Sequence, residues 1–174
     1  IGTCLVGSEM CIRDSTKACR FTPMYIACWN CHLSVCEWLF EVGAAADISK
    51  TDYNGATPMW IACQNDNLSV CKWLFEVGAA ADITRANTFG ATPMNIACKY
   101  GQLSVCKWLF EVGAAADITK ADDSCTIKST PFGGALEFGA LEVCKLLIFN
   151  EVLSDFKLPF ELSSCDKYTM NRIN

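Results

Sequence analysis

The sequence has little histidine, little charge and no long apolar run, and each shortage excludes a class of protein. His32 is the only histidine among 174 residues, so a site that needs two imidazoles cannot form within this chain. Charged residues make up 19% and the net charge is −5, without a cluster of Lys and Arg, which argues against nucleic-acid binding. No stretch of 18 or more apolar residues occurs, so we expect no membrane insertion.

What the chain has in quantity is apolar surface and thiols, with 52% hydrophobic residues and 13 cysteines. Six of these cysteines recur at two positions with a spacing of 35 residues: Cys28, Cys63 and Cys98 at one, and Cys36, Cys71 and Cys106 at the other. This regularity indicates small buried side chains rather than a disulfide framework. It predicts a reducing compartment, the cytoplasm or the nucleus.

Residues 28–32, CWNCH, have the C-x-x-C-H spacing that attaches c-type haem. Cys28 and Cys31 are also spaced for a redox dithiol or for half of a zinc site. Cys28, however, occupies a repeated core position, and no second pair of this spacing follows it. We therefore expect no cofactor, no metal and no enzyme activity, and we keep a cysteine-rich redox, metal or haem protein as an alternative.

A Thr-Pro pair recurs along the chain and marks the start of a repeating unit. The pairs begin at Thr22, Thr57, Thr92 and Thr130, with spacings of 35, 35 and 38 residues. The threonine is a good N-cap and the proline suits the first helical turn, so each pair predicts the start of a short helix. In the second unit a break and a new cap at Asp66 and Asn67 precede a second helix over residues 68–77, which Gly78 closes.

The second helix of each unit is apolar on nearly all sides, as in LSVCKWLFEV at residues 68–77. A helix of this kind cannot lie on a surface, and a unit of about 35 residues cannot bury it alone. Stacking of one unit on the next would bury it. We expect Trp38, Trp73 and Trp108 to form a buried row through such a stack, and each to cost about 3–5 kcal/mol on change to alanine.

The pattern TPMxIAC followed by LSVCxWLFEVGA resembles the ankyrin repeat, whose signature combines T-P-L-H-x-A, a second apolar helix and a closing glycine. The resemblance implies an all-α fold, an α-solenoid of stacked helix-turn-helix units with hairpin-like loops. It covers residues 22–156, with units at about 22–56, 57–91, 92–129 and 130–156. The family's usual histidine is replaced by Tyr25, Trp60, Asn95 or Gly133, so we expect the polar contact that it often makes to be absent.

The two ends of the chain differ from the repeats. Residues 5–15, LVGSEMCIRDS, match the conceptual translation of a transposase sequencing adaptor, so we interpret residues 1–15 as non-native and start the array at residue 16. Residues 157–174 are expected to form a C-terminal capping segment or tail. We expect further repeats upstream in the native protein, and therefore an exposed apolar face at Met24, Ile26 and Trp38.

The positions that differ between the units lie at the end of the first helix and in the loop, and the resemblance implies that partners bind there. Aromatic residues are frequent among them, as is typical of binding anchors. The candidate partner-binding residues are Tyr25, Trp29, Tyr53, Asn54, Trp60, Gln64, Asn65, Thr88, Phe89, Asn95, Lys99 and Tyr100. We predict a non-catalytic scaffold for an unidentified protein partner, or alternatively a regulatory or substrate-presenting segment of a larger enzyme or channel.

Overall fold

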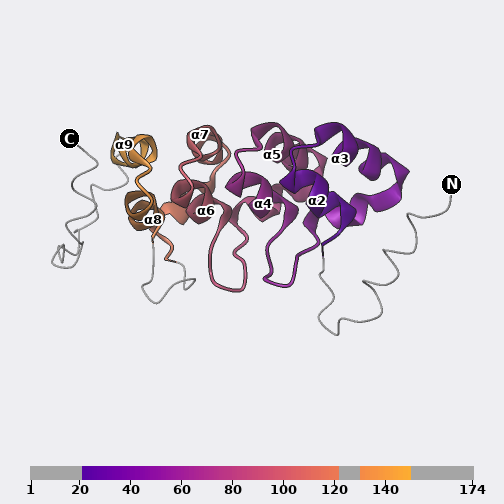
Figure 1. The fold of residues 1–174 in the computed structure, drawn as a ribbon, viewed down its shortest axis with the longest axis horizontal. Coiled ribbons are helices and arrows are strands. Elements are labelled where there is room, and N and C mark those ends of the chain that lie inside the picture. Colours follow the sequence, from indigo (N-terminus) through magenta and orange to yellow (C-terminus); the bar gives the residue numbers. More distant parts are fainter. Residues whose placement is uncertain (1–20, 122–129, 150–174) are drawn as a thin grey trace.

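The computed structural model describes residues 21–121 and 130–149, and these residues form four stacked pairs of antiparallel helices (Figure 1). The first helices are α2 (Pro23–Trp29), α4 (Pro58–Gln64), α6 (Pro93–Lys99) and α8 (Pro131–Glu137). The second helices are α3 (Leu33–Leu39), α5 (Leu68–Leu74), α7 (Leu103–Glu111) and α9 (Leu141–Phe149). The predicted adaptor-derived segment and C-terminal tail lie outside the described residues.

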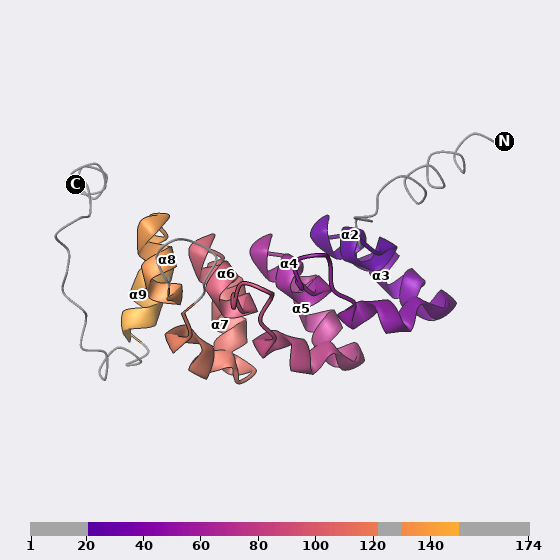
Figure 2. The same cartoon turned by 90° about the horizontal axis from the view of Figure 1, so that it is seen from below.

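The helices form two layers, one of first helices and one of second helices, as both views show (Figures 1 and 2). Within the first layer α2 packs on α4, α4 on α6 and α6 on α8. In the second layer α3, α5, α7 and α9 contact one another in the same order. The predicted α-solenoid is confirmed: each unit contacts chiefly its neighbours along the stack.

The Thr-Pro pairs start the first helices as predicted. The hydroxyl of Thr57 accepts a hydrogen bond from the Trp60 amide at 3.2 Å, and Pro58 fills the first turn, where a missing N–H costs nothing. The other three threonines, Thr22, Thr92 and Thr130, accept the equivalent amide at 3.1–3.3 Å. A local sequence signal therefore fixes where each unit begins.

The segment after each of the first three second helices begins with short helical turns before the hairpin-like loop. A tight π-type turn at η3 (Phe75–Ala79) contains Gly78, whose φ of +119° is the left-handed conformation that closes the helix. The chain then continues as a 3₁₀ turn, η4 (Ala80–Thr84), before it becomes extended at Arg85. The same order recurs at η1 (Phe40–Ala44) with η2 (Ala45–Ser49), and a 3₁₀ turn recurs at η5 (Ala114–Thr119). The segment after these second helices therefore consists of regular turns before the loop begins.

The core lies between the two layers and is built from methionine, alanine, cysteine and valine at repeated positions. The thiols form one pair within each unit, across the two helices: Cys28 with Cys36, Cys63 with Cys71, and Cys98 with Cys106, all with sulfur atoms 3.7 Å apart. All six are free and buried, which confirms the expectation that they serve as small core side chains.

The expected row of buried tryptophans is only partly present. Trp108 is 6% exposed and Trp73 is half-buried, but Trp38 is 57% exposed. The reason is that each tryptophan packs against a phenylalanine of the preceding unit: Trp73 on Phe40 and Trp108 on Phe75, with ring centroids 5.9 Å apart in both pairs. No described residue provides this partner for Trp38.

The apolar face predicted at the N-terminal end is present, with one correction. Ile26 and Trp38 are exposed there, as expected. Met24 is fully buried instead, because its side chain lies in the core between the layers, like Met59 in the next unit.

The predicted second cap is also different in the structure. Asn67 stands at the N-terminus of α5, but its side chain makes no capping bond to that helix. Its amide nitrogen donates to the carbonyl oxygens of Cys28 and Trp29 in the preceding unit, at 2.8 and 3.0 Å. The position therefore ties two units together, because its side chain donates to two carbonyl groups at the end of α2. Among the described residues, no helix is long and apolar enough to cross a membrane.

Candidate partner-binding face

Two loop tips project from the layer of first helices, at residues 50–57 and 85–92 (Figure 1). Asp52 shapes the first, since its carboxylate accepts the amides of Asn54 and Ala56, both at 2.8 Å. Asn87 shapes the second in the same way, accepting from Phe89 and Ala91 at 3.0 Å. A side chain that accepts from amides two and four residues ahead builds a compact hairpin-like turn. Neither residue is among those predicted from the sequence.

The two tips are bonded to each other. The amide and the hydroxyl of Thr88 both donate to the carbonyl oxygen of Asn54, at 2.8 Å. Gly55 makes this approach possible, because a Cβ at that position would lie 3.1 Å from the Thr88 nitrogen. Asn54 and Thr88, two of the predicted binding residues, therefore also hold the tips in register.

The position after Thr-Pro-Met joins each first helix to the loop that follows it. The hydroxyl of Tyr25 donates to Asp52 at 3.4 Å, the indole N–H of Trp60 donates to the Ala91 carbonyl at 3.0 Å, and the amide of Asn95 donates to the Lys120 carbonyl at 2.9 Å. The expectation that replacement of the family's histidine removes a polar contact is wrong for the first three units. Three different side chains each supply one.

These contacts also correct two of the predicted binding residues. Tyr25 and Asn95 are buried, because each side chain is used inside the molecule to hold its loop. Neither can serve as an accessible anchor on the surface. Burial and the neighbouring Asp52 carboxylate raise the pKa of Tyr25 above its ordinary value, so its hydroxyl stays protonated as a donor.

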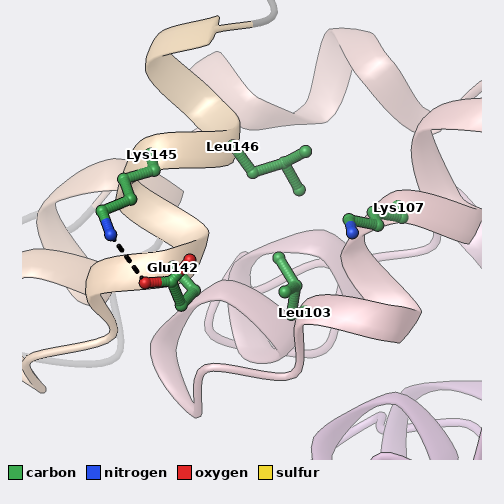
Figure 3. A pocket seen from close by; sticks show the side chains of 5 residues that line it. All are labelled: Leu103, Lys107, Glu142, Lys145 and Leu146. Atoms are coloured by element: carbon green, nitrogen blue, oxygen red, sulfur yellow. Dashed lines mark hydrogen bonds and ion pairs between the residues drawn. The ribbon is translucent and has the colours of Figure 1, made fainter.

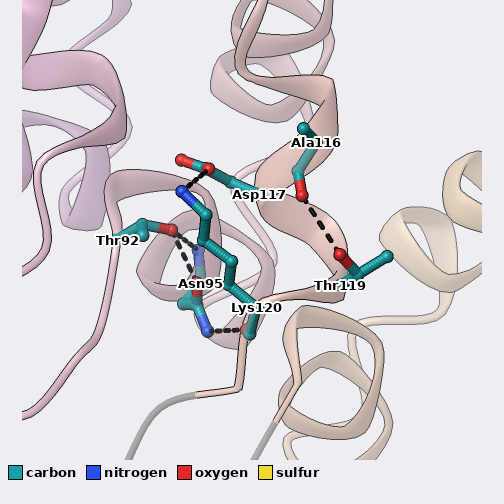
Figure 4. A network of polar contacts seen from close by, with 6 residues as sticks. All are labelled: Thr92, Asn95, Ala116, Asp117, Thr119 and Lys120. Atoms are coloured by element: carbon teal, nitrogen blue, oxygen red, sulfur yellow. Dashed lines mark hydrogen bonds and ion pairs between the residues drawn. The ribbon is translucent and has the colours of Figure 1, made fainter.

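Figure 4 shows how far this polar network extends in the third unit. The Thr92 hydroxyl donates to the Asn95 side-chain oxygen at 2.6 Å, and Asn95 in turn reaches Lys120. Lys120 pairs with the buried carboxylate of Asp117, with 2.6 Å between nitrogen and oxygen. The network thus anchors the segment after α7 to the start of α6.

At the N-terminal end of the face, aromatic side chains form a cluster. Phe21 lies at the centre, with ring centroids 6.2 Å from Trp29 and 6.1 Å from Tyr53, both in edge-to-face geometry. Trp29 and Tyr53 are exposed. Phe21 precedes the first Thr-Pro pair and was not among the predicted residues, since no repeat position singles it out.

A second exposed aromatic cluster lies at the other end. Tyr100 and Phe138 have ring centroids 6.1 Å apart, and the Lys99 ammonium lies 5.0 Å from the Phe138 ring centroid. Phe138 was missed, although alignment of the fourth unit with the third places it opposite Tyr100.

The predicted residues therefore fall into three groups by exposure. The exposed ones are Trp29, Tyr53, Asn65, Thr88, Phe89 and Tyr100; the half-buried ones are Asn54, Trp60, Gln64 and Lys99; the buried ones are Tyr25 and Asn95. We call the exposed and half-buried groups, with Phe21 and Phe138, the loop face.

The C-x-x-C-H motif does not present its two sulfur atoms together. Cys28 is buried beside Cys36, whereas Cys31 and His32 are exposed in the turn between α2 and α3. Within the described ranges no group of three or more potential metal ligands occurs. Burial raises the pKa of the Cys63 thiol well above its ordinary value, which favours an inert protonated thiol over a nucleophile or a metal ligand.

Comparison with known families agrees with this architecture. The profile of ankyrin repeats in three copies matches residues 3–87, 44–122 and 77–157. The chain belongs to the ankyrin repeat family. Ankyrin repeats are generally protein–protein interaction modules, and the family is typically non-catalytic. No curated protein matches the ankyrin chain in sequence.

Proposed function

We propose that this ankyrin chain binds a protein partner through the loop face, acting as a non-catalytic scaffold in the cytoplasm or the nucleus. The observation that carries the proposal is the exposure of large aromatic side chains on loop tips that hydrogen bonds join to each other. Tyr53 and Phe89 project from the two tips that Thr88 ties together, and neither side chain is needed for that bond. Aromatic residues held rigidly at a surface are typical anchors of protein interfaces.

The shape of the face supports an extended partner rather than a small molecule. The exposed aromatic residues lie at both ends of the stack, in the cluster around Phe21 and in the pair of Tyr100 and Phe138. Phe89 lies on the tip between them. A polypeptide that follows the row of first helices would meet one anchor per unit, as the stacked surfaces of repeat proteins allow.

The test compares the wild-type chain with a variant in which Tyr53, Phe89 and Tyr100 are changed to alanine. All three side chains are exposed, so the fold should be retained, which far-UV circular dichroism checks. A matched control changes three exposed residues of the second helices and their ends, Val42, Lys72 and Glu111. Proteins captured by the wild type are identified and their affinities are then measured with purified components.

We expect the loop-face variant to lose at least about tenfold in affinity and the control to bind like the wild type, since a few anchors carry most of an interface's energy. Equal affinity of all three proteins for every partner would overturn the assignment of the face.

A further inference from the structure

The contact between adjacent units has two halves, and each end of the described array carries one of them. The tryptophan of α5 packs on Phe40 of the preceding unit, and the tryptophan of α7 packs on Phe75. At the N-terminal end, Trp38 is the tryptophan that would make this contact, and it is 57% exposed. At the C-terminal end Ile148 occupies the phenylalanine position of the fourth unit and lies 54% exposed.

Neighbouring positions show the same exposure at the ends and burial inside. Val35 of α3 is 41% exposed, whereas the equivalent Val70 and Val105 are fully buried. In the fourth unit, Leu136 takes the position of the first-helix cysteine; it is exposed, although Cys98 at the same position is fully buried. Each end therefore presents apolar side chains at positions that the fold buries or half-buries wherever a neighbouring unit is present.

The charges at this contact differ between the two ends. One exposed position of the second helix carries Glu37 in the first unit and Lys72, Lys107 and Lys145 in the others. Figure 3 shows that adjacent units bring this position to the two sides of one open groove, with Lys107 on α7 facing Glu142 and Lys145 on α9. Within the described array, the only acidic residue at this position is therefore at the N-terminal end, and a lysine is at the C-terminal end.

We propose that the N-terminal face of one copy, formed by Ile26, Val35 and Trp38, stacks on the C-terminal face of a second copy, formed by Leu136 and Ile148. The contact repeats the geometry that already joins the units within the chain. Trp38 would pack on Ile148 in place of phenylalanine, and Glu37 would lie across the groove from Lys145 of the second copy. The N-terminal face supplies the tryptophan and the glutamate, and the C-terminal face supplies the aliphatic side chain and the lysine.

Such a contact is heterologous, since the two faces are different, and it leaves one free face of each kind after every addition. Association therefore continues beyond the dimer as the concentration rises. It is independent of the loop face, which lies along the side of the stack.

The test is sedimentation of the full chain, residues 1–174, over a range of concentrations in reducing buffer. Two variants each block one face: Trp38→Glu and Ile148→Glu. Both side chains are more than half exposed, so the substitutions should leave the fold intact, as circular dichroism verifies. Tyr53→Glu, an exposed aromatic residue on a loop tip, is the matched control.

We expect the wild type and the control to grow in mass with concentration and each face variant alone to remain monomeric. A mixture of Trp38→Glu with Ile148→Glu should form dimers and stop there, because each variant retains one working face. Glu37→Lys should weaken association of the otherwise unchanged chain by at least about threefold, since it replaces an attraction across the groove with a repulsion.

Two results would overturn the proposal. Monomeric wild type at every concentration would mean that these faces do not bind a second copy, whether covered by the chain's own flanking residues or left unused. Dimers formed by either face variant alone would show that like faces pair with each other. Neither result would affect the proposed partner binding, which uses other residues and another assay.

Discussion

Trp73 packs edge-on against Phe40 of the preceding unit, with ring centroids 5.9 Å apart and ring planes at 84°. The pair recurs one unit later as Trp108 on Phe75, at the same distance and at 85°. The tryptophan at this position therefore contributes differently to stability in units of nearly identical sequence, because it packs on the preceding unit and not within its own. This dependence on the neighbour determines how substitutions should behave along the array.

Removal of a tryptophan should have a cost that depends on its place in the stack. Trp108→Ala should lower the free energy of unfolding by about 3–5 kcal/mol, as expected for a large buried aromatic side chain. Trp38→Ala should cost less than about 1 kcal/mol, since its side chain lies mostly in solvent. Urea denaturation of both variants, at a protein concentration too low for self-association, measures the difference. Equal losses would contradict the exposure that the structure assigns to Trp38.

The turn between the helices of each unit should tolerate glycine better than any other residue. Cys31 and Asp66 have φ values of +59° and +57° in this turn, and Gly101 occupies the equivalent position with +74°. Because a side chain disfavours this conformation, Cys31→Gly should raise the free energy of unfolding by about 1 kcal/mol. Gly101→Ala should lower it, since the added Cβ would also lie 3.3 Å from the Ala140 Cβ. A stabilising Gly101→Ala would refute this account of the turn.

The side chain of Asn67 should couple the first unit to the second. Asn67→Ala removes the side-chain donor to the carbonyl groups of Cys28 and Trp29, which should lower the free energy of unfolding by about 1–3 kcal/mol. Amide hydrogen exchange should accelerate most in α2, because the bond holds the end of that helix. Asn65→Ala is a suitable control: its side chain is exposed and bonds to Ile61 of its own helix. Uniform acceleration over all units would contradict a local role.

Alkaline pH should destabilise the fold through its buried thiols. Burial raises the pKa of Cys63 well above its ordinary value of 9.0, so the native state keeps this proton while the unfolded chain loses it. The stabilisation is complete below about pH 8.5, where the unfolded thiol is also protonated, and is lost as the pH rises toward the native pKa. Each such thiol contributes a slope of up to about 1.4 kcal/mol per pH unit.

Urea denaturation with reductant at pH 7.5, 8.5 and 9.5 checks this dependence. Cys63→Ala should make the decline above pH 8.5 shallower, because one titrating thiol has been removed. Cys31→Ala, which removes an exposed thiol, should leave the decline unchanged. A wild-type free energy of unfolding that stays constant or rises over this interval would argue against buried, protonated thiols.

Among the candidate binding residues, exposure was predicted correctly where a position is free to vary because nothing covers it. Trp29, Tyr53, Phe89 and Tyr100 are exposed as expected. The same criterion failed at Tyr25 and Asn95, because a position also varies when different side chains can make equivalent contacts there. A tyrosine hydrogen-bonded to Asp52 and an asparagine hydrogen-bonded to the Lys120 carbonyl both join a first helix to the loop that follows it. Variation alone does not distinguish these two causes.

The sequence by itself determined the period of the array, the start of each first helix and the need for stacking, because these depend on local features: a threonine cap, a proline in the first turn and a helix too apolar to stand alone. Only the tertiary structure decided which side chains the stacking covers. The burial of Trp108, the exposure of Trp38 and the role of Asn67 all depend on atoms of another unit, brought close by packing geometry that the spacing of residues does not contain.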